Sequence, residues 1–404
     1  MKVEERFFHY ISYWTTSEED REEIPSTARQ FDLARALEQE LKELGLIKVR
    51  CDEHCYVYGM LPATEGFEKK KSIGFISHMD TAPSFSGKNV KPVVIPDYDG
   101  RDVTLKSGAV LKTSDFPRLT GRIGQTLIIT DGTTLLGADD KAGIAEIMTA
   151  FEQMISEKHP HGDLWVAFTP DEEVGAGADK FDLDYFKADY AYTVDGDYEG
   201  EISYENFNAA AADFQIQGVN VHPGSAKNIM VNAASIACEI QSMLPPLEVP
   251  EHTEGREGFY HLYEMKGDVN YAKLRYIIRD HDKDLFEKRL SILREIERTM
   301  QEKYEKETVT LTISESYHNM LEVIEQHFYI VEKAKDAIRN AGADPVSIPV
   351  RGGTDGARLS FSGLPCPNLG TGGDGFHGPL EHITVEGMET AVKVILELMK
   401  HPMD

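Results

Sequence analysis

Acidic residues and histidines of this sequence repeatedly stand at the ends of apolar, strand-like segments or in turns beside them. The residues in such positions are His78, Asp80, Asp139, Asp140, Asp171, Glu172, Glu173, Asp195 and His377. In an open α/β sheet, ligands bind outside the carboxyl ends of the strands. We therefore expect these side chains to converge on one crevice.

The chemistry that these residue types support is metal-assisted hydrolysis. Imidazole nitrogen and carboxylate oxygen suit Zn²⁺, with Co²⁺ or Mn²⁺ as substitutes. Two histidines and several carboxylates exceed what one tetrahedral zinc needs, and they fit two metal ions about 3.5–4 Å apart that share a bridging carboxylate. One further carboxylate must then move a proton from water to the leaving amine. Each segment alone, such as DDKAG or PDEE, also fits a helix start with acids that complement the dipole.

The size and charge of the chain exclude several classes of partner. Its 404 residues exceed what one hydrophobic core usually serves, so two domains are predicted. The net charge of −27 argues against binding to nucleic acid or to anionic membranes. The sequence has no apolar run long enough to span a membrane, and its start, MKVEERFFHYISYW, lacks a signal-peptide core. We expect a cytoplasmic protein.

The cysteines are too few for a disulfide scaffold in a chain of this length; they are Cys51, Cys55, Cys238 and Cys366. The stretch CDEHC (51–55) has a histidine between two cysteines and raises the alternative of a zinc site. No second Cys/His pair stands at zinc-finger spacing. The pattern favours a turn between the strands VRC and CYVYGML.

The first half of the chain alternates helices with apolar strands. Hydrophobic periodicity predicts helices over 26–45 and 142–155. The segments SIGFIS, LWVAFTP and YAYTV are apolar and rich in strand formers. This alternation indicates an α/β structure whose sheet is covered on both faces.

The pattern changes near residue 208. Segment 209–221 alternates like a half-exposed strand, and 226–244 reads as a helix with Ile229 on its apolar face. Three elements complete the block: a strand over 271–280, a long helix over 282–307 and a strand over 308–313. The block 208–316 therefore predicts a small open-faced α/β two-layer sandwich. It is inserted into a first domain whose parts are 1–207 and 317–404.

The motifs SHMDT, LLGADDKAGIAEIM, AFTPDEEVGAGA, YTVDG, NVHPGSAKNIMVNA, GFYHL with YIIRD, RGGTDGARLS and the late FHG resemble the M20 metallopeptidase family, and within it the tripeptide aminopeptidases. They follow the family's order over nearly the whole chain. The resemblance implies a zinc-peptidase-like catalytic domain with a covered mixed sheet and an inserted lid domain. It also implies two Zn²⁺ per subunit and release of the N-terminal residue from tripeptides.

The resemblance implies a role for each candidate residue of the metal site. Asp139 bridges the two ions, His78 and Asp195 complete one site, and Glu173 and His377 complete the other.

Two further carboxylates have implied roles that are not ligation. Glu172 is the general base, and Asp80 orients His78 by accepting its other ring N–H. The family also places a cis peptide bond after the bridging aspartate, here between Asp139 and Asp140.

Three residues are candidates for substrate binding, each with a plainer alternative. His222 in NVHPG is either an oxyanion donor of the lid or an ordinary turn residue. Arg279 and Arg351 are candidate clamps for the peptide's C-terminal carboxylate. An ion pair between Arg279 and its neighbours Asp280 and Asp282 is the alternative for that residue.

Several alternatives remain open on the sequence. Dipeptidases, carboxypeptidases and amide deacetylases of the M20 family share the metal site and differ in clamp and lid. A non-catalytic metal- or peptide-binding protein is disfavoured because the non-ligand residues Asp80 and Glu172 are both present. Lid domains of the family often pair, so 208–222 fits either a homodimer through the lid or a solvated sheet edge.

The sequence departs from the family pattern in two places. DYEGE, which begins at Asp197, replaces a mostly neutral stretch, and Asp374 lies close to His377. Both add negative charge, which we expect near the cleft and which bears on the preferred substrate.

Overall fold

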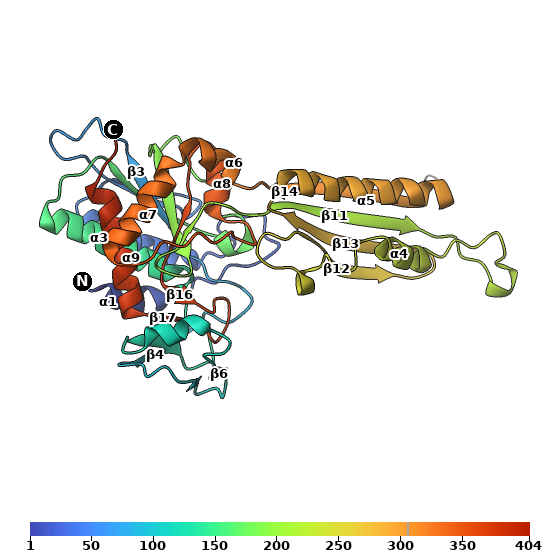
Figure 1. Cartoon of the computed structure of the whole chain (residues 1–404), viewed down its shortest axis with the longest axis horizontal. Helices are drawn as coiled ribbons and strands as arrows, with labels where there is room; N and C mark the ends of the chain where they lie inside the picture. Colours follow the sequence, from blue (N-terminus) through green and yellow to red (C-terminus); the bar gives the residue numbers. More distant parts are fainter. Residues whose placement is uncertain (305–306) are drawn as a thin grey trace. The chain divides into compact units, whose positions relative to one another are not determined.

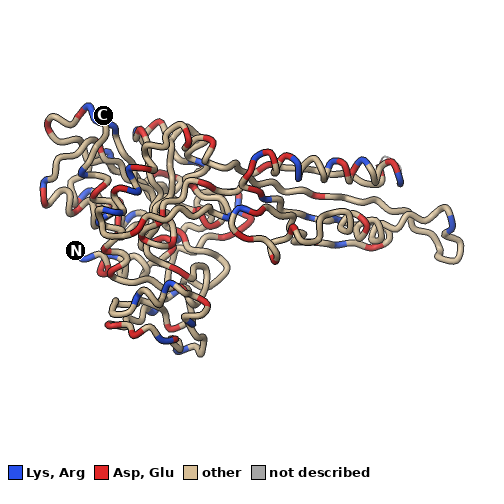
Figure 2. The backbone as a smooth tube through the Cα atoms, in the orientation of Figure 1, with Lys and Arg blue, Asp and Glu red and all other residues tan. Residues whose placement is uncertain are grey.

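The computed structural model describes residues 1–304 and 307–404, and these form two compact units (Figure 1). Unit 1 comprises Met1–Tyr204, Glu322–Ile348 and Thr354–Asp404, and unit 2 comprises Glu205–Leu321 and Pro349–Gly353. Among the described residues, no helix is long and apolar enough to cross a membrane. Figure 2 shows acidic and basic residues interspersed along the chain of both units.

Unit 1 is built on a mixed sheet. In spatial order its strands are β1 (Ile47–Cys51), β2 (Val57–Leu61), β8 (Leu164–Thr169), β3 (Ile73–His78), β9 (Tyr190–Gly196), β15 (Asn368–Gly370) and β10 (Ile202–Ser203). β3 runs parallel to both β8 and β9, with His78 opposite Thr169. The carboxyl ends of these three neighbours therefore meet at one edge of the sheet.

β3 and β8 are buried along their whole length, which shows that both faces of the sheet are covered at these strands. The helices of unit 1 are α1 (Val3–Ile11), α2 (Gln30–Glu43), α3 (Ala138–Glu157), α7 (Tyr329–Ala341), α8 (Asp355–Phe361) and α9 (Val385–Lys400), and the short α6 (Leu321–Ile324) begins at the unit boundary. On one face, the ring of Phe75 packs edge-on against Phe151 of α3. On the other, Ile76 and Trp165 share a core with Leu359 of α8.

A smaller sheet of unit 1 was not predicted from the sequence. It pairs β16 (Gly373–Asp374), β17 (His382–Thr384), β7 (Leu127–Thr130) and β4 (Pro92–Ile95), beside the two-stranded β5 (Val103–Thr104) and β6 (Val110–Leu111). Its strands are two to four residues long, which is too short for a clear alternating pattern.

Unit 2 is a sheet with two helices on one face. The strands, in spatial order, are β12 (Phe259–Gly267), β13 (Tyr271–Asp280), β11 (Asn208–Gln217) and β14 (Val309–Tyr317), and the helices are α4 (Ala233–Ser242) and α5 (Lys283–Tyr304). Phe214, Tyr276, Ile240 and Leu290 belong to one apolar core between sheet and helices. The opposite face is polar, with an ion pair of 2.7 Å between Lys273 and Asp213.

Two predicted elements of unit 2 need correction, and one was missed. The helix predicted over 226–244 begins only at Ala233, where the Asn232 side chain accepts the N–H of Ser235, so Ile229 is 55% exposed instead of inward. The long helix predicted over 282–307 ends at Tyr304 in the described chain, and residues 305–306 lie outside the described residues. β12 was not predicted.

Candidate metal centre

The sheet of unit 1 gathers the predicted ligands at the carboxyl ends of its central strands. His78 is the last residue of β3, Asp195 lies at the end of β9, and Glu173 lies in the turn that follows β8. Asp139 lies at the start of α3, and His377 lies in the loop between β16 and β17.

The two oxygens of the Asp139 carboxylate face different histidines. Nε2 of His78 lies 2.7 Å from Oδ1 of Asp139 and 3.3 Å from Oδ1 of Asp195. Nε2 of His377 lies 3.0 Å from Oδ2 of Asp139 and 2.9 Å from Oε2 of Glu173. Asp139 thus joins two sets of donors, each with one imidazole and two carboxylates.

The two sets differ in their access to solvent. The His78 side chain is 2% exposed, whereas that of His377 is 52% exposed. His377 also has a positive φ of 63°, in the left-handed region that non-glycine residues rarely adopt.

The start of α3 has the cis peptide bond between Asp139 and Asp140 that the family resemblance implied. Asp140 is fully buried, and its Oδ2 accepts the main-chain N–H of His78 at 3.1 Å. Its other oxygen has no hydrogen-bond partner within residues 1–304 and 307–404. Asp140 therefore supports the main chain at the end of β3.

Asp80 contacts more than the histidine that the sequence assigned to it. Its Oδ1 lies 3.3 Å from Nδ1 of His78, while its main-chain oxygen is closer to the same nitrogen, at 3.1 Å. The carboxylate also accepts the main-chain N–H of Glu172 at 3.0 Å and of Glu173 at 3.2 Å. One buried side chain therefore fixes the turn that carries both the predicted base and a predicted ligand.

The crowded carboxylates of the cluster shift the pKa values of its histidines and of Glu173. Burial alone would lower the pKa of His78, but the carboxylates of Asp195 and Asp139 outweigh it and raise the pKa well above its usual value. Hydrogen bonds to Asp139 and Glu173 raise the pKa of His377 to about 11. Burial, followed by the charge of Asp139, raises the pKa of Glu173 to about 7.

These properties fit a site for divalent cations. The donors are imidazole nitrogens and carboxylate oxygens, which are the ligands that zinc takes in catalytic sites. Three-residue groups with ligand atoms within 4.8 Å of one another are His78 with Asp139 and Glu173, and His78 with Asp140 and Asp195. Oε1 of Glu173 is buried and has no hydrogen-bond partner in the described chain, so it is available to a cation.

Comparison with known proteins shows which family the chain belongs to. The model of "Peptidase family M20/M25/M40" matches residues 130–401. The chain belongs to peptidase family M20/M25/M40. It is 53% identical over 404 residues to peptidase T of Caldanaerobacter subterraneus subsp. tengcongensis, and the match covers 99% of this chain and 98% of the relative. The predicted M20 membership is confirmed.

Solved structures share the M20 fold over the whole chain. An aminopeptidase PepT from Bacillus cereus superposes with a TM-score of 0.78 at 23% identity, covering 99% of this chain and 97% of that one. A tripeptidase from Staphylococcus aureus gives the same values. The predicted fold class, a mixed covered sheet with a second α/β unit, is confirmed.

Glu381 supports the turn that carries Asp139 but was not predicted. Its carboxylate is 1% exposed and accepts three main-chain N–H groups: Leu136 at 2.7 Å, Gly137 at 2.9 Å and Asp139 at 3.0 Å. Burial raises its pKa to about 7. Glu381 lies in the same loop as His377, between β16 and β17, so its hydrogen bonds tie that loop to the turn that presents Asp139.

Asp355 is a second buried acid that the sequence did not reveal. It begins α8, accepts a 2.9 Å hydrogen bond from Oγ1 of Thr169, and lines the same small cavity as His78 and Glu172. A Cβ at Gly177 would lie 2.3–2.6 Å from this carboxylate, so only glycine fits there. Burial raises the pKa of Asp355 to about 7.

The two acidic departures from the family pattern interact with each other. Burial, then the charges of Glu201 and Asp374, raise the pKa of Asp197 to about 7. Nη1 of Arg118 lies 3.7 Å from Asp197 and partly compensates this charge. The loops that carry the two aspartates are joined by a hydrogen bond from the Gly372 N–H to the Asp197 carbonyl.

The three predicted substrate-binding residues lie in unit 2. His222 is exposed, and its Nδ1 accepts the N–H of Gly224 at 3.1 Å, as in a turn.

The two arginines differ in how far their donors are used. Arg351 donates to the main-chain oxygens of Thr253, Gly255 and Glu257, so it holds that loop. Arg279 is half-buried and lies over the ring of Tyr317. Their roles toward substrate stay predictions.

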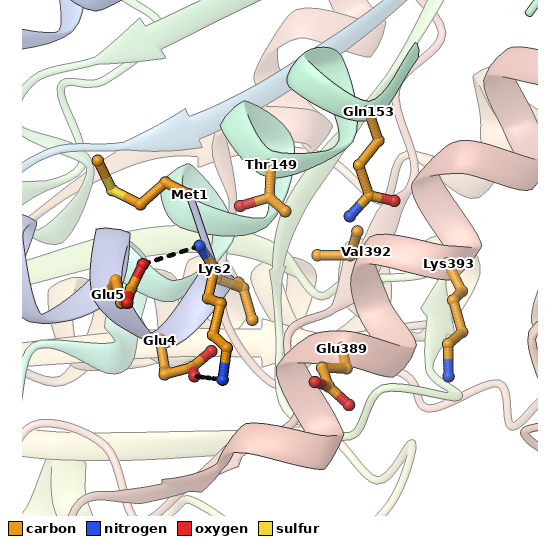
Figure 3. Close-up of a pocket in the computed structure, with 10 residues that line it drawn as sticks. Met1, Lys2, Glu4, Glu5, Thr149, Gln153, Glu389, Val392 and Lys393 are labelled. Atoms are coloured by element: carbon orange, nitrogen blue, oxygen red, sulfur yellow. Dashed lines mark hydrogen bonds and ion pairs between the residues drawn. The ribbon is translucent and has the colours of Figure 1, made fainter. Parts of the chain in front are cut away.

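A hollow elsewhere in unit 1 is a poor candidate for the active site. It has a volume of about 590 Å³ and is bordered by α1, α3 and α9, with Thr149, Gln153 and Val392 among its walls (Figure 3). Its charged groups are partly paired with each other: Lys2 lies 3.4 Å from Glu4, and the Lys2 N–H donates to Glu5. None of its lining residues is a predicted ligand or base.

Proposed function

We propose that this chain is a two-zinc aminopeptidase that releases the N-terminal residue from tripeptides. The observation that carries the proposal is the Asp139 carboxylate, whose two oxygens face His78 and His377 at 2.7 and 3.0 Å. The 53% identity with a protein named peptidase T supports the substrate class. A cytoplasmic location and a homodimer through unit 2 stay predictions.

The residues divide into two ligand sets around Asp139. His78 and Asp195 would complete one ion, and Glu173 and His377 would complete the other. When bound, the two zinc ions polarise the scissile carbonyl and lower the pKa of the water that attacks it.

Glu172 is the proton carrier in this proposal. Burial, then the charge of Asp195, raises the pKa of Glu172 well above its usual value. A carboxylate with a raised pKa takes a proton from water and releases it to the leaving amine more readily than an ordinary glutamate. The hydrogen bond from its N–H to Asp80 fixes the turn that aims it.

Arg279 is the stronger of the two proposed carboxylate clamps. The neighbouring Asp280, one of the two alternative partners considered for Arg279, pairs with Arg289 at 2.7 Å. In the described part of the chain, the hydrogen bond from Nη1 of Arg279 goes to a main-chain oxygen, that of Ile278. A guanidinium suits the bidentate binding of a peptide carboxylate. Arg351 and His222 are proposed as a second clamp and as the oxyanion donor.

The test is hydrolysis of Met-Gly-Gly beside Met-Gly and N-acetyl-Met-Gly-Gly. Each is assayed after chelation and again after zinc is restored, with bound zinc counted. We expect zinc-dependent release of methionine from the free tripeptide alone, and two zinc ions per chain. Cleavage of the dipeptide or of the blocked peptide instead would assign a different M20 activity. No hydrolysis of any of them would refute the enzymatic proposal.

A further inference from the structure

The turn that carries the proton carrier Glu172 is short and ends at a glycine. Glu172–Val174 form a single turn of 3₁₀-helix, and the N–H of Gly175 donates to the Glu172 carbonyl at 2.7 Å. Gly175 has a positive φ of 75°, which glycine adopts at little cost. A single turn of this kind has few hydrogen bonds of its own, so groups outside it must hold its position.

The start and the end of this turn are held by different side chains of unit 1. At the start, Asp80 accepts the N–H groups of Glu172 and Glu173. At the end, Nη1 of Arg358, which lies on α8, donates to the Gly175 carbonyl at 2.6 Å. Asp80 therefore fixes where the turn begins, and Arg358 fixes where it ends.

The Arg358 guanidinium is itself aimed by a second partner. Its Nη2 forms an ion pair with Asp179, in the loop that follows the turn. The two acceptors use both terminal nitrogens of the planar guanidinium, which lysine cannot reproduce because its ammonium is a single point charge. The Arg358 side chain is 34% exposed, and ion pairs near the surface contribute little to stability. These contacts therefore favour a positional role over a stabilising one.

Helix α8 approaches the same loop a second time, at Asp355. A Cβ on Gly177 would lie 2.3–2.6 Å from the Asp355 carboxylate, so the main chain of the loop packs directly against the start of α8. Asp355 also accepts the hydroxyl of Thr169, the last residue of β8, and it lines the same small cavity as Glu172. α8 is therefore anchored to the central sheet on one side and to the loop after Glu172 on the other.

We propose that Arg358 is a positioning residue for the proton carrier Glu172. This inference rests on the proposed peptidase function and deepens it. By holding the Gly175 carbonyl, Arg358 sets the direction in which the turn presents the Glu172 side chain. Among the described residues, the side-chain hydrogen bonds of Arg358 go to Gly175 and Asp179, so it acts through the turn. Its loss should slow the chemical step and leave substrate binding and zinc content unchanged.

The first test compares Arg358→Ala with the matched control Arg50→Ala. Arg50 pairs with Asp182 and is 35% exposed, nearly as Arg358 is, but it lies on β1 and not beside the turn. We expect Arg358→Ala to lower kcat for Met-Gly-Gly by about tenfold or more, because a displaced catalytic group costs at least that much, and to change KM by less than about threefold. Bound zinc should be unchanged, and Arg50→Ala should keep the wild-type kcat.

Two further readouts separate positioning from a merely structural role. Arg358→Lys keeps the charge beside Asp179 but not the fork, so it should recover only part of the lost kcat. Guanidinium chloride at non-denaturing concentration should raise the kcat of Arg358→Ala, because the added ion can take the place of the missing side chain, and it should not raise that of Arg50→Ala. Thermal unfolding shows that each variant is folded, and Arg358→Lys carries the test if Arg358→Ala is not.

Hydrogen exchange tests the position of the turn without a peptidase assay. On the full-length protein, we expect the amides of residues 172–176 to exchange at least about tenfold faster in Arg358→Ala than in wild type, because the turn opens more often, and at the wild-type rate in Arg50→Ala. Unchanged exchange in this segment would overturn the proposal, and so would a wild-type kcat in Arg358→Ala. A wild-type protein that hydrolyses none of the peptides, together with faster exchange in Arg358→Ala, would refute the peptidase function alone and support Arg358 as the residue that holds the turn.

Discussion

Replacing Asp80 by asparagine separates two accounts of what this residue does. If Asp80 mainly orients His78, the substitution should weaken the metal set that contains His78. The structure indicates that the substitution should instead weaken the set that contains Glu173 and His377. The reason is that the Asp80 carboxylate accepts the N–H groups of Glu172 and Glu173. His78 keeps the main-chain oxygen of residue 80, at 3.1 Å from its Nδ1, whatever the side chain is.

The expected cost follows from these contacts. Asparagine offers one acceptor oxygen, so one of the two N–H groups would face an NH₂ group. Leaving a buried N–H without an acceptor costs about 1–3 kcal/mol, and loss of the charge on the remaining bond costs about 1 kcal/mol more. We expect Asp80→Asn to lower the free energy of unfolding of the chelated protein by about 2–4 kcal/mol.

Urea unfolding and zinc competition measure the two effects. The zinc affinity of each set is isolated in a second variant: His377→Ala retains the His78 set, and Asp195→Ala retains the His377 set. We expect Asp80→Asn to change the zinc affinity by less than about threefold in the first background. In the second background we expect it to lower the affinity by about tenfold or more, which corresponds to about 1.4 kcal/mol, because the turn that carries Glu173 is no longer held.

Asp52→Asn is the matched control. Asp52 likewise accepts two main-chain N–H groups, from His54 at 3.0 Å and Tyr56 at 2.9 Å, but it holds the turn between β1 and β2. It should lower stability and leave zinc affinity unchanged. The reasoning would be refuted if Asp80→Asn weakened zinc binding mainly in the His377→Ala background, or if it left the stability of the chelated protein unaltered.

Three further outcomes are expected. Glu172→Gln should lower kcat by at least about 100-fold with unchanged zinc content, because it removes the proton carrier and no ligand; unchanged turnover of Met-Gly-Gly would contradict this role. Chelation should lower Tm in a scanning experiment and added zinc should restore it, since a cation that binds only the folded state stabilises it; a Tm insensitive to both would count against the centre. Burial lowers the pKa of Lys333 from 10.5 to about 8, so the unfolded chain binds more protons between these values and stability from this group rises with pH there. Lys333→Met should therefore raise the free energy of unfolding at pH 7 by about 1–2 kcal/mol, allowing for its lost bond to Tyr190, and urea titrations should show this gain shrinking above pH 8.

The sequence predicts the candidate metal centre because its parts are local. His78, Asp195 and Glu173 each follow an apolar segment, and the rule that strand ends meet at one edge brings them together without any coordinates. The cis bond at Asp139 came from family resemblance, not from spacing.

Other parts depend on contacts that no local pattern shows. Glu381 looks like a surface acid until the three N–H groups of residues 136–139 close around it. The strands of the small sheet pair residues far apart in the chain, such as Ile128 with Ile383. The helix predicted from 226 overran because its apolar spacing continues through Ile229, although the cap at Asn232 sets the true start.

The unequal exposure of the two histidines has a kinetic consequence. A cation held by His377 could exchange with the medium through a solvent-facing side chain, whereas one held by His78 could leave only if buried groups moved. The two ions would then have different residence times, and brief dialysis would yield half-loaded enzyme. Measured specific activity would depend on how recently each batch had met zinc.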